Sequence, residues 1–284
     1  MAVQSGLGFE AFGEQDYTQF AAKVQHRFRV RLADYRAEQM QRRICTMAQR
    51  NGFKSFVEYF GGLEKVQDLA NEFMNEITIN VTELLRNKNL FENLFRDVIP
   101  GLVEARAGAP LSVWSAGCSY GAEAYTLAML LSEAIPSGAF RIRGTDIDLS
   151  ILARANSPSF NENDMVNVCP ERRKKFFMTP DDKTYIPLSA LRNKVQFSPH
   201  DLLADPYVPT QYDLILCRNV LIYFTDEAKE RVYRGFFQSL RPGGVLFIGG
   251  TERLINYSDI GYNLIAPFFY RKPENAVPAS LRAA

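Results

Sequence analysis

The feature that most constrains the fold is an alternation of short apolar runs with helical patterns, which begins after Pro110. Continuous apolar runs bounded by turn residues predict buried strands, and apolar residues at three- and four-residue spacing predict helices. Strands are expected at Leu111–Ser115, Phe140–Thr145, Val195–Phe197, Tyr212–Cys217, Val245–Gly249 and Phe268–Tyr270, with helices over about 122–134, from Leu149 and over about 227–240. Because such alternation builds parallel βαβ units, the sequence predicts an α/β fold with a doubly wound sheet.

The first part of the chain carries helical patterns instead. Apolar residues from Phe20 to Tyr35 predict one amphipathic helix, and Ala37–Arg50 should form a second, which Asn51-Gly52 would end. Ser55 is a candidate N-cap for a third helix closed by Gly61-Gly62, and a fourth is expected over about 64–75.

These patterns divide the chain into successive parts. We predict a small all-α domain over 10–83, a linker helix over 84–110 and an α/β domain over 111–271, with a short insert near 179–194. Two prolines and few apolar residues predict a loose tail over 272–284.

Composition excludes several classes of protein. No apolar run approaches the roughly 20 residues that span a bilayer, and the N-terminus has no secretory pattern. The four cysteines lie far apart without a CxxC pair, which excludes a zinc ribbon and argues against a disulfide framework. Two histidines leave little for a histidine-rich metal site. We therefore expect a cytoplasmic monomer without a metal and without membrane insertion.

Charge is unevenly distributed along the chain. The overall net charge is +1, but residues 23–54 contain nine Lys and Arg against two acidic residues, a local net charge of +7. Such a run indicates either a face for an acidic partner or a solvated helix surface.

A glycine-containing turn follows the first predicted strand. Residues 115–123 read Ser-Ala-Gly-Cys-Ser-Tyr-Gly-Ala-Glu, and Gly117 would let the backbone approach a ligand where the next helix offers free amide donors. Asp146 ends the following strand, where a carboxylate can accept hydrogen bonds from both ribose hydroxyls. Capping the next helix is the alternative role, but Asp148 suits it better. Asp201 stands either beside an adenine pocket or in a simple turn.

The stretch from Asp213 to Phe224 is the most informative one. Arg218 and Asn219 stand at the carboxyl end of a buried strand, where open α/β sheets bind ligands. Polar groups there cost free energy unless they have partners, and either a ligand or backbone carbonyls could serve.

Five motifs occur together in one order. They are Asn80-x-Thr82-x-x-x-Arg86, Ala116-Gly117-Cys118-Ser119-x-Gly121-x-Glu123, Thr145-Asp146-Ile147-Asp148, Cys217-Arg218-Asn219-Val220-Leu221-Ile222-Tyr223-Phe224 and Leu240-Arg241-Pro242-Gly243-Gly244. In this combination the chain resembles the CheR family of chemotaxis receptor glutamate methyltransferases, from about Phe20 to Arg271.

The resemblance implies a class I, Rossmann-like methyltransferase domain that uses S-adenosylmethionine (SAM) and releases S-adenosylhomocysteine (SAH). It also implies that Arg86 and Tyr223 face the reacting carboxylate and that the basic face 23–54 binds acidic helices of the receptor. With Gly117 of the glycine turn included, the predicted cofactor-binding residues are Asn80, Thr82, Arg86, Gly117, Glu123, Asp146, Asp201, Leu202, Arg218 and Asn219.

The chain departs from the usual family pattern in several places. The glycine turn retains Glu123, but Tyr120, Ala122 and Ala124 replace a Thr, a Glu and a Pro. Two leucines, 84 and 85, stand where phenylalanines are common, and an Asp replaces an Asn at 201. The segment 179–194 is short and lacks the glycine-bearing loop with which some members hold a receptor's C-terminal pentapeptide, so we do not expect that tethering.

Three other functions stay open. Tyr120 could crowd the cofactor, which would leave a binding adaptor without activity. A methyltransferase could act on a small molecule or a nucleic acid, although the basic run lacks the interleaved aromatics of a stacking platform, so no nucleic acid is expected. A nicotinamide dehydrogenase is disfavoured because the GxGxxG fingerprint is missing.

Overall fold

The computed structural model describes residues 12–78 and 80–275, which form two compact units. The helical unit consists of the N-terminal residues up to 78 together with Tyr223–Ala228, and the sheet unit consists of Asn80–Ile222 and the residues from Lys229 onward. No helix in the described part of the chain has both the length and the apolar character of a membrane span.

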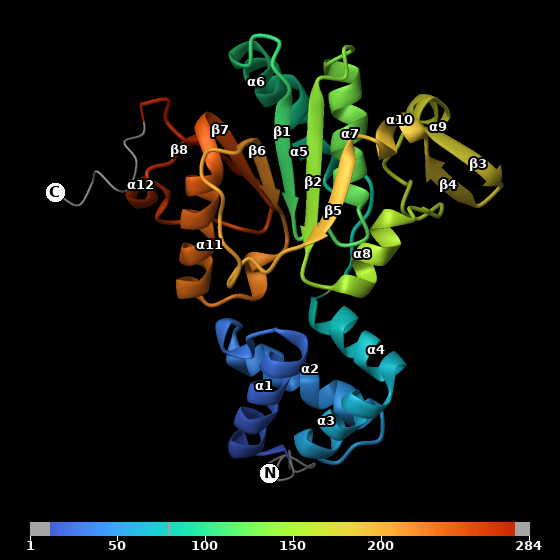
Figure 1. The fold of residues 1–284 in the computed structure, drawn as a ribbon, viewed down its shortest axis with the longest axis vertical. Helices are drawn as coiled ribbons and strands as arrows, with labels where there is room; N and C mark the ends of the chain where they lie inside the picture. Colours follow the sequence, from blue (N-terminus) through green and yellow to red (C-terminus); the bar gives the residue numbers. More distant parts are fainter. Residues whose placement is uncertain (1–11, 79, 276–284) are drawn as a thin grey trace, which may run out of the picture. The chain divides into compact units, whose positions relative to one another are not determined.

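The helical unit packs around a cluster of aromatic rings. Phe73 is fully buried and lies 6.0 Å from the rings of Phe20 and Tyr59 and 5.5 Å from that of Phe28. The helices of this unit are α1 (Glu14–Phe28), η2 (Leu32–Asp34), α2 (Ala37–Arg50), α3 (Phe56–Lys65) and α4 (Gln67–Thr78). The all-α character predicted for this region is confirmed (Figure 1).

A segment from far along the sequence completes the helical unit. The backbone N–H of Arg36 donates to the Tyr223 carbonyl at 2.9 Å, and that of Thr225 donates to the Asp34 carbonyl at 2.8 Å. Between these bonds, Tyr35 and Phe224 form an antiparallel bridge with their ring centroids 4.9 Å apart. Residues 223–228 therefore belong to the helical unit by hydrogen bonding as well as by packing.

Two expected helix boundaries in this unit are wrong. The first helix ends at Phe28, because Arg29 adopts a left-handed conformation with φ of 59°, so Leu32 and Tyr35 lie outside it. The third helix begins after the Ser55 cap as predicted but continues past Gly61 and Gly62 to Lys65. A Cβ at Gly62 would lie 2.5 Å from the Phe53 ring, so this glycine permits close packing inside the helix and does not end it.

A seven-stranded sheet organises the second unit, in the order β5-β2-β1-β6-β7-β9-β8. β1, β2, β5, β6 and β7 pair in parallel, and β9 is antiparallel to both β7 and β8. The strands are β1 (Leu111–Ala116), β2 (Phe140–Asp146), β5 (Val195–Pro199), β6 (Tyr212–Cys217), β7 (Leu240–Ile248), β8 (Asn263–Ala266) and β9 (Phe269–Arg271). The predicted doubly wound α/β architecture is confirmed.

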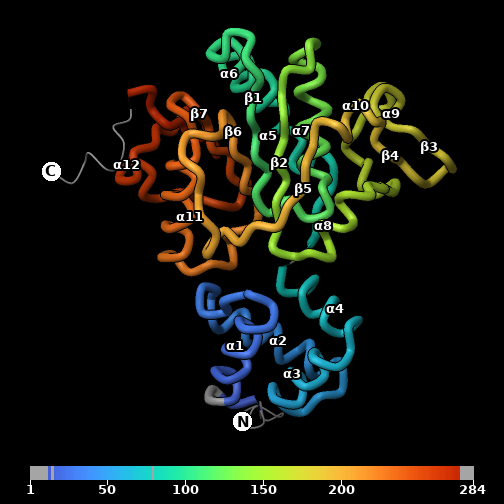
Figure 2. Tube along the Cα trace, in the orientation of Figure 1, coloured from blue at the N-terminus to red at the C-terminus, as the bar shows by residue number. Residues whose placement is uncertain are grey.

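Helices connect these strands and cover the sheet. Figure 2 shows the golden β5 beside the green β2, although a long stretch of chain separates them. The helices that follow residue 80 are α5 (Lys88–Asn93), η3 (Leu94–Val98), α6 (Ile99–Ala105), α7 (Ala122–Ala134), α8 (Leu149–Asn156), α9 (Pro170–Phe176), α10 (Ser189–Arg192), η4 (Leu221–Tyr223), α11 (Asp226–Ser239) and α12 (Tyr257–Ile260).

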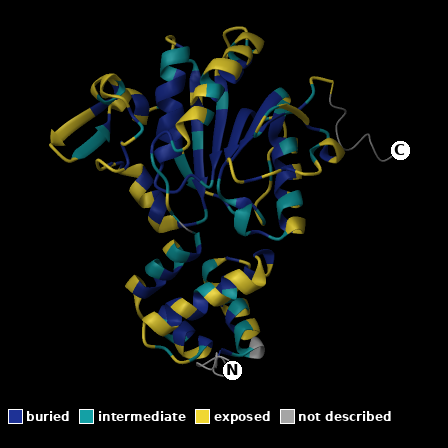
Figure 3. Ribbon diagram, turned by 180° about the vertical axis from the view of Figure 1, so that it is seen from behind, coloured by how far each residue is buried: buried dark blue, intermediate teal, exposed yellow. Residues whose placement is uncertain are grey.

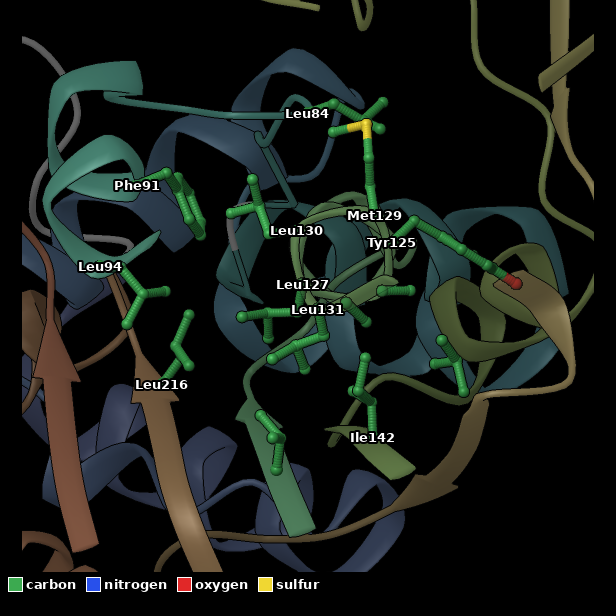
Figure 4. Close-up of a cluster of buried hydrophobic side chains, with 14 of the residues drawn as sticks. Leu84, Phe91, Leu94, Tyr125, Leu127, Met129, Leu130, Leu131, Ile142 and Leu216 are labelled. Atoms are coloured by element: carbon green, nitrogen blue, oxygen red, sulfur yellow. The ribbon is translucent and has the colours of Figure 1, made fainter. Parts of the chain in front are cut away.

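The main hydrophobic core lies between α7 and one face of the sheet. Leu127 and Leu131 of α7 are buried with Ile142 of β2 and Leu216 of β6 (Figure 4). Trp114 of β1 points to the opposite face, because successive strand residues alternate, and its ring lies 5.3 Å from that of Phe236 on α11. Burial on both faces explains the apolar sequence of the central strands β1 and β6, which are buried along nearly their whole length (Figure 3).

The sequence patterns missed a small hairpin and the edge strand. The hairpin of β3 (Phe177–Asp181) and β4 (Thr184–Pro187) forms a separate two-stranded sheet, most of which is exposed or half-buried (Figure 3). β8 at the sheet edge is largely exposed as well. The apolar runs in these segments reach three residues at most, as at Leu264–Ala266 in β8, which was too short a signal to predict a strand.

The loose tail predicted from Lys272 begins too early. The Lys272 side chain is buried, and its ammonium donates to the carbonyls of Phe237 and Leu240 at 2.8 Å. Its backbone also pairs with Gly243 and Gly244. These bonds extend the ordered structure past β9, while residues 276–284 of the predicted tail lie outside the described residues.

Phe73→Ala should lower the free energy of unfolding by about 3–5 kcal/mol, because it removes a fully buried ring and leaves a cavity among its aromatic neighbours. Urea denaturation followed by circular dichroism measures the loss. Val57→Ala, in a side chain that is 46% exposed, is the control and should change stability by less than about 0.5 kcal/mol. Equal losses would contradict the proposed aromatic core.

Candidate active site at the carboxyl edge of the sheet

The glycine turn follows β1, where the strand order reverses direction between β1 and β6. Ligands bind at such points in open α/β sheets. Gly117, Ser119 and Gly121 all have positive φ, of 74°, 50° and 91°. The N–H groups of Gly117 and Cys118 both donate to the Thr145 carbonyl at 2.8 Å, which ties the turn to the end of β2.

Asp146 is buried beside this turn. Its Oδ2 accepts from the Ser119 N–H at 2.9 Å, and its Oδ1 accepts from the Asp148 N–H at 3.1 Å. Burial raises the pKa of the Asp146 carboxyl, whereas these backbone N–H groups act in the opposite direction. Asp148, and not Asp146, caps α8, because its side chain accepts from Ser150 and Ile151. The prediction that Asp148 suits the cap better is confirmed, and the role of Asp146 as a cofactor ligand stays a prediction.

Glu123 and Arg218 form a buried pair. The Glu123 carboxylate accepts from the Ser115 hydroxyl at 2.7 Å and lies 3.4 Å from an Arg218 nitrogen. Burial raises the pKa of Glu123 and lowers that of Arg218. The guanidinium carbon of Arg218 lies 4.6 Å and 4.8 Å from the ring centroids of Phe91 and Phe247. These contacts partly compensate for removing the charge from water.

The same arginine holds the segment that carries Arg86. One Arg218 nitrogen donates to the Arg86 carbonyl at 2.8 Å and to the Asn87 side chain at 3.0 Å. Leu85 and Asn87, on either side of Arg86, have positive φ of 55° and 61°. The Arg86 side chain is half-buried and donates to the Val81 carbonyl at 2.6 Å. Arg218 thus satisfies one backbone carbonyl, and its role as a cofactor ligand stays a prediction.

Tyr120 anchors the beginning of this segment. Its hydroxyl donates to the Thr82 carbonyl and lies 2.8 Å from Asp164 Oδ1. The ring is buried, with the Arg154 guanidinium carbon 4.0 Å from its centroid. The Asn80 side chain in turn donates to Asp148 at 3.0 Å. Residues 80–87 are thus held against the glycine turn and α8 by side chains from several elements.

The sheet unit contains all of the predicted cofactor-binding residues. Asp201 is half-buried, and its Oδ1 accepts from the Leu203 N–H at 2.8 Å, as in a turn, while Leu202 is buried. Asn219 has a positive φ of 60°. Its side-chain amide donates to Thr251 at 3.4 Å. Their roles as cofactor ligands stay predictions.

Tyr223 belongs to the helical unit and so to a different compact unit from Arg86. There it lines a pocket of about 410 Å³ on the side of α2. The pocket is lined by Arg36, Gln39, Met40, Arg42, Arg43, Thr46, Glu76 and Tyr223. Three arginines against one glutamate make this lining basic.

Glu252 was not predicted. This buried residue follows β7, and its carboxylate accepts backbone N–H groups from Asn219, Leu221 and Gly249 at 2.7–3.0 Å. The sequence did contain a signal for Glu252, because this acidic residue stands only four positions after a buried apolar strand. The end of that strand lies at the same edge of the sheet as Asp146 and Arg218.

Comparison with known families shows to which protein family the chain belongs. Residues 80–264 match the description "CheR methyltransferase, SAM binding domain", and residues 15–78 match "CheR methyltransferase, all-alpha domain". The chain belongs to the CheR methyltransferase family. It is accordingly a SAM-dependent methyltransferase, and the family resemblance seen in the five sequence motifs is confirmed.

Relatives within the CheR family match over most of their length. The chemotaxis protein methyltransferase of Listeria monocytogenes is 40% identical over 259 residues, which cover 91% of this chain and 98% of that protein. That of Escherichia coli is 29% identical and covers 85% of each chain. A solved TehB-like SAM-dependent methyltransferase from Corynebacterium glutamicum is 16% identical with a TM-score of 0.35, over 65% of this chain and 93% of that structure, a likeness too slight to bear on function.

Gly117→Ala should destabilise the protein more than Gly243→Ala does. Both glycines have positive φ, of 74° and 79°, so both substitutions carry the left-handed cost of about 1–2 kcal/mol. Only at Gly117 would the new Cβ meet a neighbour, Val220 Cγ2, at 2.4 Å, whereas at Gly243 the nearest atom is 3.7 Å away. We expect a further loss of about 1–3 kcal/mol for Gly117→Ala in urea denaturation. Equal losses would mean that Val220 does not press on the turn.

Proposed function

We propose that this methyltransferase forms methyl esters on glutamate side chains of chemotaxis receptors, as a protein-glutamate O-methyltransferase. The observation that carries the proposal is the match to proteins named chemotaxis protein methyltransferase over nearly their whole length. Within the sheet unit, the polar residues at the carboxyl edge of the sheet are candidates to hold SAM. Within the helical unit, the basic pocket is a candidate site for an anionic side chain.

The residues at the sheet edge fit SAM. The Ser119 hydroxyl is buried without a hydrogen-bond partner among the described residues, so it retains both a donor and an acceptor for a polar ligand. We assign the ribose hydroxyls to Asp146, whose buried carboxylate retains acceptor capacity beyond its two N–H contacts. Glu123, Asn80 and the other predicted residues would surround the rest of the cofactor.

The methyl-accepting group needs no general base. A glutamate side chain has a reference pKa of about 4.3 and is already anionic at neutral pH. Bound SAM supplies an electrophilic methyl group on a sulfonium, and its transfer to the carboxylate leaves SAH. The protein must therefore orient the carboxylate and keep water from it, and correct orientation can supply roughly 7–11 kcal/mol of the barrier.

We assign the orienting roles to Arg86 and Tyr223. Arg86 would hold a carboxylate, either that of the substrate or that of the cofactor, and the backbone contact to Arg218 would fix its position. The Tyr223 hydroxyl would donate a hydrogen bond to the reacting group. Its surroundings in a pocket with three arginines are suited to an anionic side chain.

The basic face 23–54 is the proposed receptor contact. Every Lys and Arg side chain in this range is exposed except Arg43, which is half-buried. Such a surface attracts acidic helices and accelerates their association at low salt. We do not propose tethering through a receptor pentapeptide.

The adaptor alternative rests on Tyr120, and the placement of this residue favours an active enzyme. The Tyr120 ring is packed into the buried core, and its hydroxyl holds the Thr82 carbonyl. The altered glycine turn thus supports the segment that carries Asn80 and Thr82.

Asp146→Asn should weaken SAH binding at least tenfold at neutral pH, because an amide cannot accept both ribose hydroxyls. Isothermal titration calorimetry measures the affinity. Hydroxyl donors favour the ionised carboxylate, so wild-type affinity should fall on acidification. Because burial raises the pKa of Asp146, the fall should begin above the ordinary value of 3.8. In Asp146→Asn, the loss of SAH affinity that comes from protonation of this carboxylate should vanish. An affinity equal to that of the wild type would refute the assignment of Asp146 to the ribose hydroxyls.

Arg86→Ala should lower kcat by about a hundredfold, which corresponds to roughly 2.7 kcal/mol of lost transition-state stabilisation. Transfer of labelled methyl groups to a receptor cytoplasmic fragment measures the rate. Arg96→Ala, an exposed arginine paired with Asp97 in the same unit, is the matched control and should retain activity. Near-normal turnover of the Arg86 variant would exclude Arg86 from the reaction.

A further inference from the structure

Glu252 joins the carboxyl ends of two neighbouring strands. Its Oε2 accepts the N–H of Asn219, after β6, at 2.8 Å and the N–H of Gly249, after β7, at 2.7 Å. Its Oε1 accepts the N–H of Leu221 at 3.0 Å. The residue is only 5% exposed, so these bonds replace its hydration. A single side chain thus fixes the path of the backbone immediately after Arg218.

The conformation fixed in this way is one that the backbone does not favour by itself. Asn219 is left-handed with φ of 60°, a conformation that few residues with a side chain adopt and that Asn tolerates better than most. Gly249 makes room for the arrangement, because a Cβ there would lie 2.6 Å from Glu252 Oε2 and 2.8 Å from the Asn219 nitrogen. The next residue, Val220, is the one that presses against Gly117. The carboxylate therefore determines the shape of the turn after β6 and of the glycine turn opposite it.

The charge of Glu252 contributes as well. Burial raises the pKa of Glu252, while its three N–H donors and the positive charge of Arg218 favour the ionised form. Glu123 and Glu252 both favour the charged form of Arg218, against the burial that lowers its pKa. Loss of the Glu252 charge would thus remove support from Arg218, which holds the Arg86 carbonyl.

We propose that Glu252 is a positioning residue for the SAM site: its carboxylate holds Asn219 and Val220 in the conformation that binds the cofactor. The inference rests on the proposed placement of SAM at this sheet edge. Glu252 acts through backbone groups and Arg218, so its loss should change the affinity for SAM and leave the affinity for the receptor unchanged.

Glu252→Gln is the sharpest test because it preserves size, removes the charge and replaces one acceptor oxygen with an NH₂ donor. The hydrogen bonds described above for this carboxylate all come from N–H donors, so the amide must turn its own NH₂ toward a donor. Losing a charged acceptor opposite a buried N–H predicts a Kd for SAH that rises about tenfold to a hundredfold. The KM for SAM should rise likewise, with the KM for a receptor fragment within about twofold of wild type.

The experiment uses the full chain, with SAH as the calorimetric probe and a receptor cytoplasmic fragment as the methyl acceptor. Glu133→Gln is the matched control, because Glu133 is a partly buried acid of the sheet unit whose 2.6 Å ion pair with Arg172 makes it a structural residue. The Glu133→Gln substitution should lower the Tm of the protein without changing its Kd for SAH. Glu252→Asp retains the charge on a shorter side chain and should recover part of the lost affinity.

Several results would overturn the proposal. A wild-type Kd and KM for SAM in Glu252→Gln, even with a lowered Tm, would make the residue purely structural. Failure of both Glu252 variants to fold would lead to the same conclusion. If wild-type protein fails to bind SAH, the cofactor placement itself is wrong, and the inference about Glu252 fails with it. If the wild-type protein binds SAH and the Glu252 variants bind it equally well, the proposed function stands and only the inference about Glu252 is wrong.

Discussion

The buried charge of Arg218 is the constraint on which the rest of the site depends. A guanidinium removed from water must be paired and hydrogen-bonded, or its desolvation would cost several kcal/mol. The chain meets most of this demand with partners from separate segments: Glu123 on α7, the Arg86 carbonyl, the Asn87 side chain and two aromatic faces. The planar guanidinium carries several N–H donors that point in different directions, which the single ammonium of a lysine does not offer in a fixed geometry. Arg218 therefore bonds α7 and the 80–87 segment at once and holds both against the end of β6.

Much of this unit could be predicted from the sequence. Apolar residues and flanking turn residues mark the strands, as in the buried run of β6, so β1, β2 and β6 could be located within a residue or two. Functional residues follow strand ends in this fold, which is why Asp146, Arg218 and Asn219 stood out. The cap at Asp148 was equally predictable, since its role depends on local geometry alone.

What could not be predicted depends on contacts between distant segments. Nothing in the local sequence indicates that Tyr120 would bind the Thr82 carbonyl or that Glu252 would bind the turn after β6. The end of α1 at Phe28 was hidden, because Arg29 is an unexpected residue in a left-handed conformation. Tyr223 was assigned to the site from the family motif, and no pattern in the sequence placed it in the pocket beside α2.

The membership of Tyr223–Ala228 in the helical unit affects how the chain can fold during synthesis. The bonds from Arg36 to Tyr223 and from Thr225 to Asp34 require a segment that leaves the ribosome only after most of the sheet has been translated. The helices α1 to α4 can form early, but their unit lacks part of its final contacts until β6 has emerged. An incomplete chain therefore leaves the surface around Tyr35 without its partner Phe224, and only translation past this point brings the two together.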